Sequence, residues 1–481
     1  MIEMSRLSEK SAVVFGTSGA RGLVTAMTDE VCWAYTRAFL QGVAPMARRV
    51  VLGQDLRPSS ARIAQACAAA IAAQGAEVIN AGVLPTPALA SFSLAEGVPA
   101  VMVTGSHIPF DRNGLKFYSA AGEITKADEV AILAARLPEA DIYSQPLPQR
   151  DARPAEHYLR RYLAFFPPGF LVGRRIGVYE HSSVARDLLP VLLTALGAEV
   201  VALGRSDSFV PVDTEAVGAE TQALGTAWAR EHRLDAILST DGDADRPLIA
   251  DETGHWLRGD LVGLLCARYL GARVVATPVS CNTAIERCGA FAQVRRTRIG
   301  SPYVIEAMQA VLAEGKRRVV GFEANGGFLL GDAVIREGRR LEALPTRDAV
   351  LPVLALLAQA QATGKPLSAL ADDLPSRFTA SDRLQDFANA RSCSLLTALS
   401  GSAKSVQSLL GESLSVELGE LTGVDETDGL RMTFAQGDIV HLRPSGNAPE
   451  LRCYTEAATQ GRAICLVKGV LERVQSSGEL V

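Results

Sequence analysis

The chain has 481 residues, of which 48% are hydrophobic and 21% charged, and its formal net charge is −5. This composition is typical of a globular protein with a large core, and the length allows about three or four domains at roughly 100–200 residues each. The charge balance gives no reason to expect nucleic acid as a partner, and no apolar run reaches the ~18 residues of a membrane helix.

The first ten residues, MIEMSRLSEK, contain no apolar signal-peptide core. Eight cysteines are scattered along the chain without a CxxC pair or a metal-ligand spacing. We therefore expect a cytoplasmic protein whose thiols are reduced and buried as small apolar side chains.

Three stretches of the chain repeat one pattern. An arginine precedes a short run rich in β-branched residues, at 50–53, 176–179 and 274–276, and a polar loop follows each run. The first two units continue through a helical stretch to the same tetrapeptide, GAEV, where glycine is expected to end the helix before a new strand. Strands that alternate with helices predict βαβ units and largely parallel sheets.

We predict three related α/β domains with mixed, largely parallel sheets, at residues 1–150, 151–253 and 254–370. The third unit, which ends near 293–298, matches the others less well, and an unrelated α/β unit is the alternative there. From about Ser376 the pattern changes to a short strand, a helical stretch and several more strands. This change predicts a smaller α+β domain at 371–481.

Three carboxylates alternate at Asp241, Asp243 and Asp245, directly after a mostly apolar run. Alternate carboxylates on a tight turn can converge on a hard divalent cation. An EF-hand needs glycine where Arg246 stands, and the preceding segment reads as a strand rather than a helix. An arginine beside three aspartates suits a site where phosphate binds next to a cation that the carboxylates hold. We therefore interpret the loop as a metal site. A solvated acidic turn is the alternative.

A lone hydroxyl, Ser106, lies in the small-residue loop TGSHIP after the apolar run 100–103. A hydroxyl nucleophile, a carboxylate cradle and a basic residue are the parts of a phosphoryl-transfer centre, although a loop serine can also be an ordinary turn residue. Neighbouring side chains on an extended segment point to opposite faces, so no dyad of Ser106 with His107 is assumed. Lys116 could return to the same pocket across a hairpin, or it could be an exposed strand lysine.

Three further loops carry polar groups that suit a sugar phosphate. The glycine-rich segment 16–22 holds Arg21 but lacks the lysine-serine/threonine end of a P-loop. Glu323 and Asn325 offer a carboxylate and an amide two residues apart, which suits paired sugar hydroxyls. Near the C-terminus, RPSGN at 443–447 and Arg452 combine guanidinium, hydroxyl and backbone N–H groups, which suit a phosphate dianion. Each segment alone could also be a polar surface turn.

In this order, the five segments resemble the motifs of the α-D-phosphohexomutase family: G-T-S-G-x-R-G, T-x-S-H-x-P, D-G-D-x-D-R, a sugar loop and R-P-S-G. The resemblance spans nearly the whole chain, with at least one motif in each predicted domain. It implies a four-domain enzyme whose active site lies in a central cleft.

The resemblance also implies a role for each motif residue. Ser106 is implied as the phosphoserine, and Mg²⁺ is held by Ser106 through its phosphate and by Asp241, Asp243 and Asp245. The residues implied at the reaction centre are Arg21, His107, Lys116 and Arg246. Those implied to bind substrate are Glu323 and Asn325 at the sugar hydroxyls, and Arg443, Ser445, Gly446, Asn447 and Arg452 at the non-reacting phosphate.

Two loops depart from the family pattern. Many relatives carry G-E-x-S-G-H in the sugar loop, whereas here Asn325 replaces the serine and Gly327 occupies the histidine position. A proton-transfer role for that histidine cannot be carried over, so we assign it to Lys116 or His107. The last loop has Asn-Ala at 447–448 where Thr-Glu is usual.

The implied activity is an intramolecular phosphoryl transfer on a hexose phosphate, through a hexose 1,6-bisphosphate that also serves as activator. Segments 104–118 and 322–327 look most like bacterial phosphomannomutases, many of which also accept glucose phosphates. Phosphoglucosamine mutase, a Mg²⁺-dependent sugar phosphatase that uses the same phosphoserine, and a non-catalytic sugar-phosphate binding protein are the alternatives. The expected partner is a hexose phosphate, with no nucleic acid or membrane, and the chain is expected to be a monomer or a homodimer.

Overall fold

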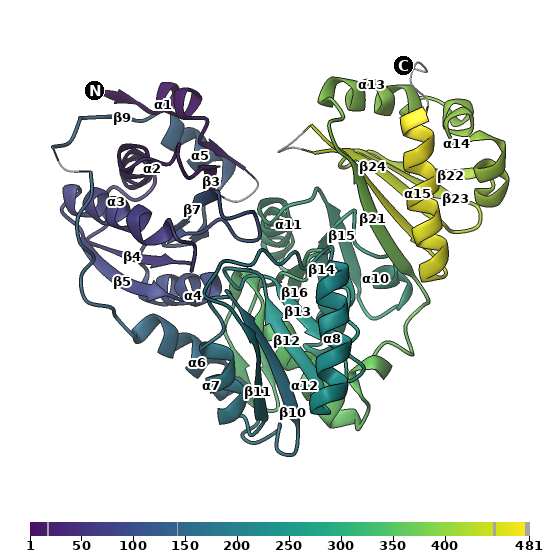
Figure 1. Cartoon of the computed structure of the whole chain (residues 1–481), viewed down its shortest axis with the longest axis horizontal. Coiled ribbons are helices and arrows are strands. Elements are labelled where there is room, and N and C mark those ends of the chain that lie inside the picture. Colours follow the sequence, from purple (N-terminus) through teal and green to yellow (C-terminus); the bar gives the residue numbers. More distant parts are fainter. Residues whose placement is uncertain (17–18, 142, 446–448, 477–481) are drawn as a thin grey trace. The chain divides into compact units, whose positions relative to one another are not determined.

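The computed structural model shown in Figure 1 describes residues 1–16, 19–141, 143–445 and 449–476. The chain forms two compact units. The first unit consists of Met1–Ala272 and Gly300–Asp372, and the second unit consists of Arg273–Ile299 and Asp373–Val481.

The N-terminal part of the first unit is built on a mixed sheet with the strand order β2-β3-β7-β6-β4-β5, and β8 pairs with β7. Strand β4 runs parallel to β5 and β6, whereas β7 is antiparallel to β6 and β3. The strands are β2 (Val14–Phe15), β3 (Ala20–Leu23), β4 (Arg49–Gln54), β5 (Glu77–Val83), β6 (Ala100–Val103), β7 (Arg112–Ser119) and β8 (Gly122–Glu123). The helices are α1 (Met4–Ser11), α2 (Asp29–Gly42), α3 (Ser60–Ala73), α4 (Thr86–Glu96) and α5 (Lys126–Leu133), and the short strands β1 (Ile2–Glu3) and β9 (Arg136–Leu137) pair with each other.

Continuous burial explains why the inner strands read as unbroken apolar runs. All four residues of β6 are buried, and so are Val50, Val51 and Leu52 in β4. Strands that alternate between core and solvent would show a period of two, so both faces of these strands are covered. Because β4 and β6 are parallel, the polar loops that follow them leave the sheet at the same edge. Open α/β sheets bind ligands at this edge.

The two GAEV segments behave as predicted. Gly75 follows α3 with φ 78° and Gly197 follows α7 (Leu188–Ala195) with φ 101°. Such positive φ angles strain residues with a Cβ, so glycine ends each helix. The next strands begin two residues later, at Glu77 in β5 and at Glu199 in β11 (Glu199–Arg205).

The middle of the first unit contains a four-stranded sheet with the order β11-β10-β12-β13. Strand β10 is parallel to β11 and β12, and β12 (Ala236–Thr240) is antiparallel to β13 (Pro247–Ala250). Residues 241–246 are therefore the turn between two adjacent strands, with Thr240 opposite Pro247. The remaining elements here are α6 (Arg153–Phe165), β10 (Arg175–His181) and α8 (Ala219–His232).

The last part of the first unit contains a second hairpin that is important for the site. Strand β16 (Val319–Phe322) pairs antiparallel with β17 (Phe328–Leu330), which pairs antiparallel with β20 (Leu344–Asp348). Residues 323–327 form the turn between β16 and β17. The other elements are α9 (Gly259–Tyr269), α11 (Ser301–Ala313), β18 (Val334–Arg336), β19 (Arg339–Leu341), α12 (Val350–Thr363) and the 3-10 helix η1 (Leu367–Ala369).

The second unit contains a five-stranded antiparallel sheet, β21-β25-β24-β23-β22, and the parallel pair β14–β15. One strand, two helices and then four strands follow each other in sequence, which is the α+β order predicted for this part of the chain. The elements are β14 (Val274–Pro278), α10 (Ala284–Arg287), β15 (Gln293–Thr297), β21 (Phe378–Leu384), α13 (Asn389–Ser400), α14 (Ala403–Leu418), β22 (Leu421–Asp425), β23 (Leu430–Phe434), β24 (Ile439–Pro444), β25 (Leu451–Ala457) and α15 (Gln460–Ser476).

Burial of the cysteines follows the prediction in part. Cys32, Cys67, Cys266, Cys281 and Cys453 are buried, whereas Cys288 is half-buried and Cys393 and Cys465 are exposed. Among the described residues, none of the helices combines the length and the apolar composition that crossing a membrane requires.

Candidate active site

The turn between β12 and β13 gathers the three aspartates in a buried cluster. Asp241, Asp243 and Asp245 are almost completely buried, and one ligand oxygen from each lies within 4.8 Å of the others. Burial, followed by the charges of the other two aspartates, raises the pKa of Asp241 well above its usual value. Three like charges without solvent repel one another, so this cluster needs positive charge close by.

Protein donors occupy one oxygen of each of two aspartates. Asp243 Oδ2 accepts hydrogen bonds from Lys116 Nζ and Thr86 Oγ1, both at 2.6 Å. Asp245 Oδ2 lies 2.6 Å from Lys116 Nζ and 2.8 Å from Arg347 Nη2. The Oδ1 atoms of Asp243 and Asp245 are buried, and among the described residues they have no hydrogen-bond partner. Each carboxylate is thus held by one oxygen while the other stays available.

This arrangement fits a hard divalent cation. The two available Oδ1 atoms and the nearby carboxylate of Asp241 are all anionic oxygens, the ligand type that Mg²⁺ prefers over the nitrogen and sulfur ligands typical of zinc. A cation would also satisfy the buried acceptors that the protein leaves unpaired. The acidic triad predicted from the sequence therefore has the geometry of a metal site.

Ser106 lies directly against the acidic cluster. Its Oγ donates to Asp241 Oδ2 at 2.6 Å, and the residue is fully buried. The two loops approach closely at Gly242, where a Cβ would lie 2.8 Å from the carbonyl oxygen of Ser106. Only glycine leaves room for this approach, which places the hydroxyl beside the carboxylates.

The backbone at Ser106 is not extended, which corrects an expectation. Its φ is 55°, in the left-handed region, so the chain turns at the serine. Side chains of neighbouring residues then need not point to opposite faces, and Ser106 Oγ lies 3.4 Å from His107 Nδ1. The serine and histidine side chains are therefore in contact, contrary to the premise of an extended segment.

Arg57, which the sequence analysis did not select, holds the serine loop together. Its two terminal nitrogens donate to four carbonyl oxygens of the loop at 2.6–3.0 Å, those of Ser106, Ile108, Pro109 and Arg112. The guanidinium also stacks on the ring of Phe209, 4.1 Å from its centroid. A planar fork with five donors is suited to binding several carbonyl groups in one fixed geometry.

Asp55 fixes Arg57 and the start of the serine loop. Its carboxylate accepts hydrogen bonds from Arg57 Nε at 3.1 Å and from Thr104 Oγ1 at 2.8 Å. Thr104 Oγ1 in turn accepts from the Ser106 backbone N–H at 2.8 Å. The signal that could have identified these residues is position, because Asp55 and Arg57 follow β4 at the edge where the loop after β6 also lies.

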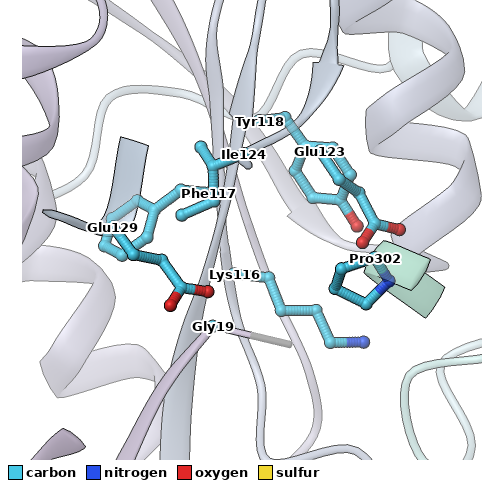
Figure 2. Close-up of a pocket in the computed structure, with 8 residues that line it drawn as sticks. All are labelled: Gly19, Lys116, Phe117, Tyr118, Glu123, Ile124, Glu129 and Pro302. Carbon is cyan, nitrogen blue, oxygen red and sulfur yellow. The ribbon is translucent and has the colours of Figure 1, made fainter. Parts of the chain in front are cut away.

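Lys116 is buried, so the alternative of an exposed strand lysine is wrong. In the β6–β7 hairpin it lies opposite Met102, and its side chain is 3% exposed. Figure 2 shows Lys116 and Tyr118 on the same side of β7, towards Glu123 and Pro302, while Phe117 extends to the other side. This alternation directs the ammonium to the carboxylates of the β12–β13 turn.

Two predicted arginines share this electrostatic environment. Arg246 Nε lies 4.0 Å from Asp241 Oδ2 and 3.7 Å from Asp245 Oδ1. Burial, and then the charges of Arg246 and Arg347, lower the pKa of Arg21 to about 10. The charges of Arg246 and Arg347 thus act on Arg21, so positive charge is concentrated here and is available to a phosphoryl group.

The same charges act on His107. The charge of Arg246, then burial and the charge of Arg21, lower the pKa of His107 well below its usual value. The imidazole is therefore neutral at pH 7, and the nearby positive charges oppose its protonation. Lys116, by contrast, donates to two carboxylates as an ammonium group.

The sugar-loop residues also lie in the first unit. Glu323 and Asn325 are buried in the β16–β17 turn, where Gly327 N–H donates to Asn325 Oδ1 at 2.9 Å. Glu323 Oε2 lies 3.3 Å from Arg347 Nη1. Since Arg347 also contacts Asp245, it connects the sugar loop with the acidic cluster.

The predicted phosphate loop belongs to the second unit. Gly446 and Asn447 lie outside the described residues. Arg443 in β24 and Arg452 in β25 are cross-strand partners, so their side chains leave the same face of the sheet. The Ser445 N–H donates to the Glu450 carbonyl at 2.8 Å, which closes the loop at its base.

A third arginine extends this row. Arg383 in β21 lies opposite Arg452 on the other side of β25. Acidic side chains accompany the row, with Asp428 Oδ2 2.9 Å from Arg443 Nε and Glu450 Oε1 3.6 Å from Arg383 Nε. Sequence spacing could not identify Arg383, because strand pairing alone makes it a neighbour of the RPSGN segment.

Comparisons with known proteins agree with the motifs. Models of the phosphoglucomutase/phosphomannomutase alpha/beta/alpha domains I, II and III match residues 12–140, 171–254 and 258–378, and the model of the C-terminal domain matches 400–470. A phosphomannomutase of Salmonella muenchen is 50% identical over 474 residues, which are 97% of this chain and 96% of that protein. A phosphomannomutase of Sinorhizobium fredii is 48% identical, over 92% of this chain and 94% of that protein.

A solved structure shares the fold. The phosphoglucomutase/phosphomannomutase family protein of Burkholderia thailandensis superposes with a TM-score of 0.74 at 20% identity, over 100% of this chain and 99% of that one. The resemblance that the motifs indicated is thus confirmed, as is the prediction of three α/β domains and a C-terminal α+β domain. The chain belongs to the phosphoglucomutase/phosphomannomutase family.

Proposed function

We propose that the chain is a phosphomannomutase that interconverts mannose 6-phosphate and mannose 1-phosphate. The observation that carries this proposal is the contact of Ser106 Oγ with the buried acidic cluster, in which two carboxylate oxygens find no hydrogen-bond partner among the residues that the structure describes. The names of the two relatives with 48–50% identity support mannose phosphate as the substrate. Turnover of glucose phosphates is part of the proposal.

Asp241, Asp243 and Asp245, with the phosphate carried by Ser106, would hold Mg²⁺. When bound, this cation neutralises charge on the oxygens of the phosphoryl group in transfer. Lys116 and Thr86 keep Oδ2 of Asp243 occupied, and Lys116 and Arg347 do so for Asp245, so that the Oδ1 atoms would be available to hold the cation. Arg21 and Arg246 supply further positive charge to the phosphoryl oxygens.

The reaction consists of two phosphoryl transfers, one from Ser106 to the sugar and one from the sugar back to Ser106. In the first half, a hydroxyl oxygen of the hexose phosphate bonds to the phosphorus on Ser106 and the bond from phosphorus to Ser106 Oγ breaks, which yields a hexose 1,6-bisphosphate. In the second half, Ser106 Oγ bonds to the other phosphorus of the bisphosphate, the bond from that phosphorus to the sugar oxygen breaks, and the isomeric hexose monophosphate leaves. Free hexose 1,6-bisphosphate acts as activator because it phosphorylates Ser106.

His107 is the proposed proton acceptor. Its imidazole is 3.4 Å from Ser106 Oγ and is neutral at pH 7, so it can take the proton of the attacking hydroxyl and return one to Ser106 Oγ. Lys116 is proposed to hold the carboxylates and the transferring group in place as an ammonium ion. Of the two bases predicted from the sequence, the geometry favours His107.

The remaining predicted residues are proposed to bind the sugar phosphate. Glu323 and Asn325 would accept and donate hydrogen bonds at the sugar hydroxyls. Arg443, Ser445 and Arg452, with Gly446 and Asn447, would bind the phosphate that does not react.

A mutase assay with mannose, glucose and glucosamine phosphates, with free phosphate measured in parallel, tests the proposal. We expect turnover of mannose phosphate that hexose 1,6-bisphosphate stimulates, and its loss in Ser106→Ala. Release of free phosphate without isomerisation would instead identify a phosphatase. Preferred turnover of glucosamine phosphate would identify a phosphoglucosamine mutase.

A further inference from the structure

Arg347 lies between two loops that are far apart in the sequence. It is part of β20, its side chain is 5% exposed, and its two terminal nitrogens contact different carboxylates. Nη2 is 2.8 Å from Asp245 Oδ2 in the acidic turn, and Nη1 is 3.3 Å from Glu323 Oε2 in the sugar loop. A rigid guanidinium fork can hold two carboxylates at a fixed separation, whereas the point charge of a lysine cannot.

Gly327 makes room for this arginine. A Cβ at position 327 would lie 2.7 Å from Arg347 Cδ and 2.8 Å from Cγ, so the stem of the arginine passes directly over the glycine. Any larger residue at 327, including the histidine that many relatives carry there, would displace the guanidinium. Gly327 and Arg347 therefore form a matched pair, in which the arginine brings a positive charge to the sugar loop.

The contact with Asp245 determines which oxygen of that residue is available. Oδ2 is occupied by Arg347 and Lys116, and Oδ1 is buried without a hydrogen-bond partner among the described residues. Arg347 thus holds Oδ2 of Asp245 and leaves Oδ1 turned away from the arginine.

We infer that Arg347 is a positioning residue that couples the cation site to the sugar loop. This inference rests on the proposed roles of Asp245 and Glu323. The guanidinium of Arg347 then has two tasks. It orients Asp245 for the divalent cation, and it holds the Glu323 carboxylate in the position proposed to bind the sugar hydroxyls. Loss of the arginine therefore weakens cation binding even without substrate, and it also weakens substrate binding.

Two variants and a matched control test this inference. Arg347→Met removes the charge, and Arg347→Lys keeps the charge without the fork. The control is Arg340→Met. Arg340 is an exposed arginine of strand β19, and its Nε lies 2.6 Å from Glu342 Oε1. Mn²⁺ affinity is measured by electron paramagnetic resonance without sugar phosphate, and KM and kcat are measured separately.

For Arg347→Met we expect at least tenfold weaker Mn²⁺ binding and at least a tenfold higher KM, with Arg340→Met unchanged in both. Arg347→Lys is expected to recover most of the Mn²⁺ affinity but not the KM, because one ammonium group cannot bridge both carboxylates. Mn²⁺ affinity and KM within twofold of the unmodified enzyme in Arg347→Met would overturn the inference.

Two further variants separate the tasks and guard against a failure to fold. Gly327→Ala keeps the arginine but displaces its stem, and it is expected to raise KM and weaken Mn²⁺ binding in the same direction as Arg347→Met. Glu323→Gln is expected to raise KM without changing Mn²⁺ affinity. In the double variant with Arg347→Met, we expect KM to be no higher than in Arg347→Met alone. If the effects of the two substitutions on KM were fully additive, they would contradict the coupling. If the unmodified chain does not turn over hexose phosphate, the proposed function fails. The Mn²⁺ titration of the variants still tests the contact of Arg347 with Asp245 in that case.

Discussion

At the scale of single residues, the candidate site depends on which polar atoms are occupied and which are left available. Asp243 and Asp245 each offer one oxygen to protein donors, and the other oxygen has no hydrogen-bond partner in the described part of the chain. Ser106 is held in a left-handed turn, a conformation that is unfavourable for a residue with a Cβ. Such strain persists only where the surroundings impose the geometry, and at Ser106 Arg57 and Asp55 do so.

Arg57 is the residue whose replacement should affect the position of Ser106 most directly. In Arg57→Lys the charge remains, but most of the four hydrogen bonds to the serine loop are lost, so the loop no longer holds Ser106 beside Asp241. We expect kcat to fall about 10- to 100-fold with KM changed by less than threefold, consistent with a loss of alignment rather than binding. Steady-state kinetics on mannose 1-phosphate measure this effect, and Arg49→Lys, at a half-buried arginine of β4 that pairs with Glu96, is the control. An unchanged kcat in Arg57→Lys would show that the serine loop keeps its shape without the fork.

His441 predicts a pH dependence of stability in the second unit. Burial lowers the pKa of His441 to about 4, while Nε2 lies 2.6 Å from the Asp428 carbonyl oxygen. The folded pKa is below the unfolded value of 6.5, so the unfolded state binds more protons between these values. Stability is therefore full above pH 6.5 and declines as the pH falls towards 4, by about 3 kcal/mol for this group.

The measurement compares denaturant unfolding of the unmodified chain and His441→Gln from pH 7 to pH 4. Glutamine stays neutral and can still donate to the Asp428 carbonyl, so the variant should lose less stability over this range. Equal losses in both proteins would mean that His441 takes up its proton without unfolding.

At the scale of elements, the site is made of turns that tight strand pairing brings together. The acidic turn joins β12 and β13, the sugar loop joins β16 and β17, and Lys116 is delivered by the β6–β7 hairpin. The helices that precede β5 and β11 end at glycine in both GAEV segments, which sets where these strands begin. Element ends therefore carry the chemistry, while the interiors of the strands supply the core.

The two helix-ending glycines offer a test with a matched pair of variants. A Cβ at Gly75 would meet nothing within 4 Å, whereas a Cβ at Gly197 would lie 2.8 Å from Val172 Cγ2 and 3.1 Å from the Val172 backbone nitrogen. Gly75→Ala should thus cost only the left-handed conformation, about 1–2 kcal/mol. Gly197→Ala should cost more, because the methyl group also collides with Val172. Denaturant unfolding of both variants measures the difference, and equal costs would show that Val172 moves away freely.

At the scale of the whole molecule, we expect the acidic cluster to make the stability of the chain depend on a divalent cation. The carboxylates of Asp241, Asp243 and Asp245 repel one another while buried, so a cation that binds the folded chain stabilises it by about 2.7 kcal/mol at 100 times its Kd. We expect Mg²⁺ to raise the Tm of chelator-treated protein and to restore its mutase activity. Both effects should disappear in Asp243→Asn. A Tm that Mg²⁺ raises equally in this variant would place the bound cation elsewhere.

Much of the fold and of the candidate site could be predicted from local sequence. The strands at the repeated arginine-led runs, the helix ends at GAEV and the α+β order of the tail depend on apolar patterning and glycine conformation, which act over a few residues. The acidic triad was predicted for the same reason, because alternation within one turn brings its oxygens together. Arg57, Arg347, Thr86 and Arg383 were missed because their partners are distant in the chain.

The sequence by itself therefore determined the chemistry of the chain: a hydroxyl, three carboxylates and the loops that resemble those of a hexose-phosphate mutase. Only the tertiary structure decided how these groups are held. In the folded chain the backbone turns at Ser106, so that the Ser106 and His107 side chains are in contact. Lys116 is buried against Asp243 and Asp245, which lie more than 120 positions along the chain. Arg57 and Arg347 bind groups from segments that are distant in the sequence. The physical reason is that residue type and spacing specify local geometry, whereas hydrogen bonds and ion pairs between distant segments exist only once strand pairing has brought those segments together.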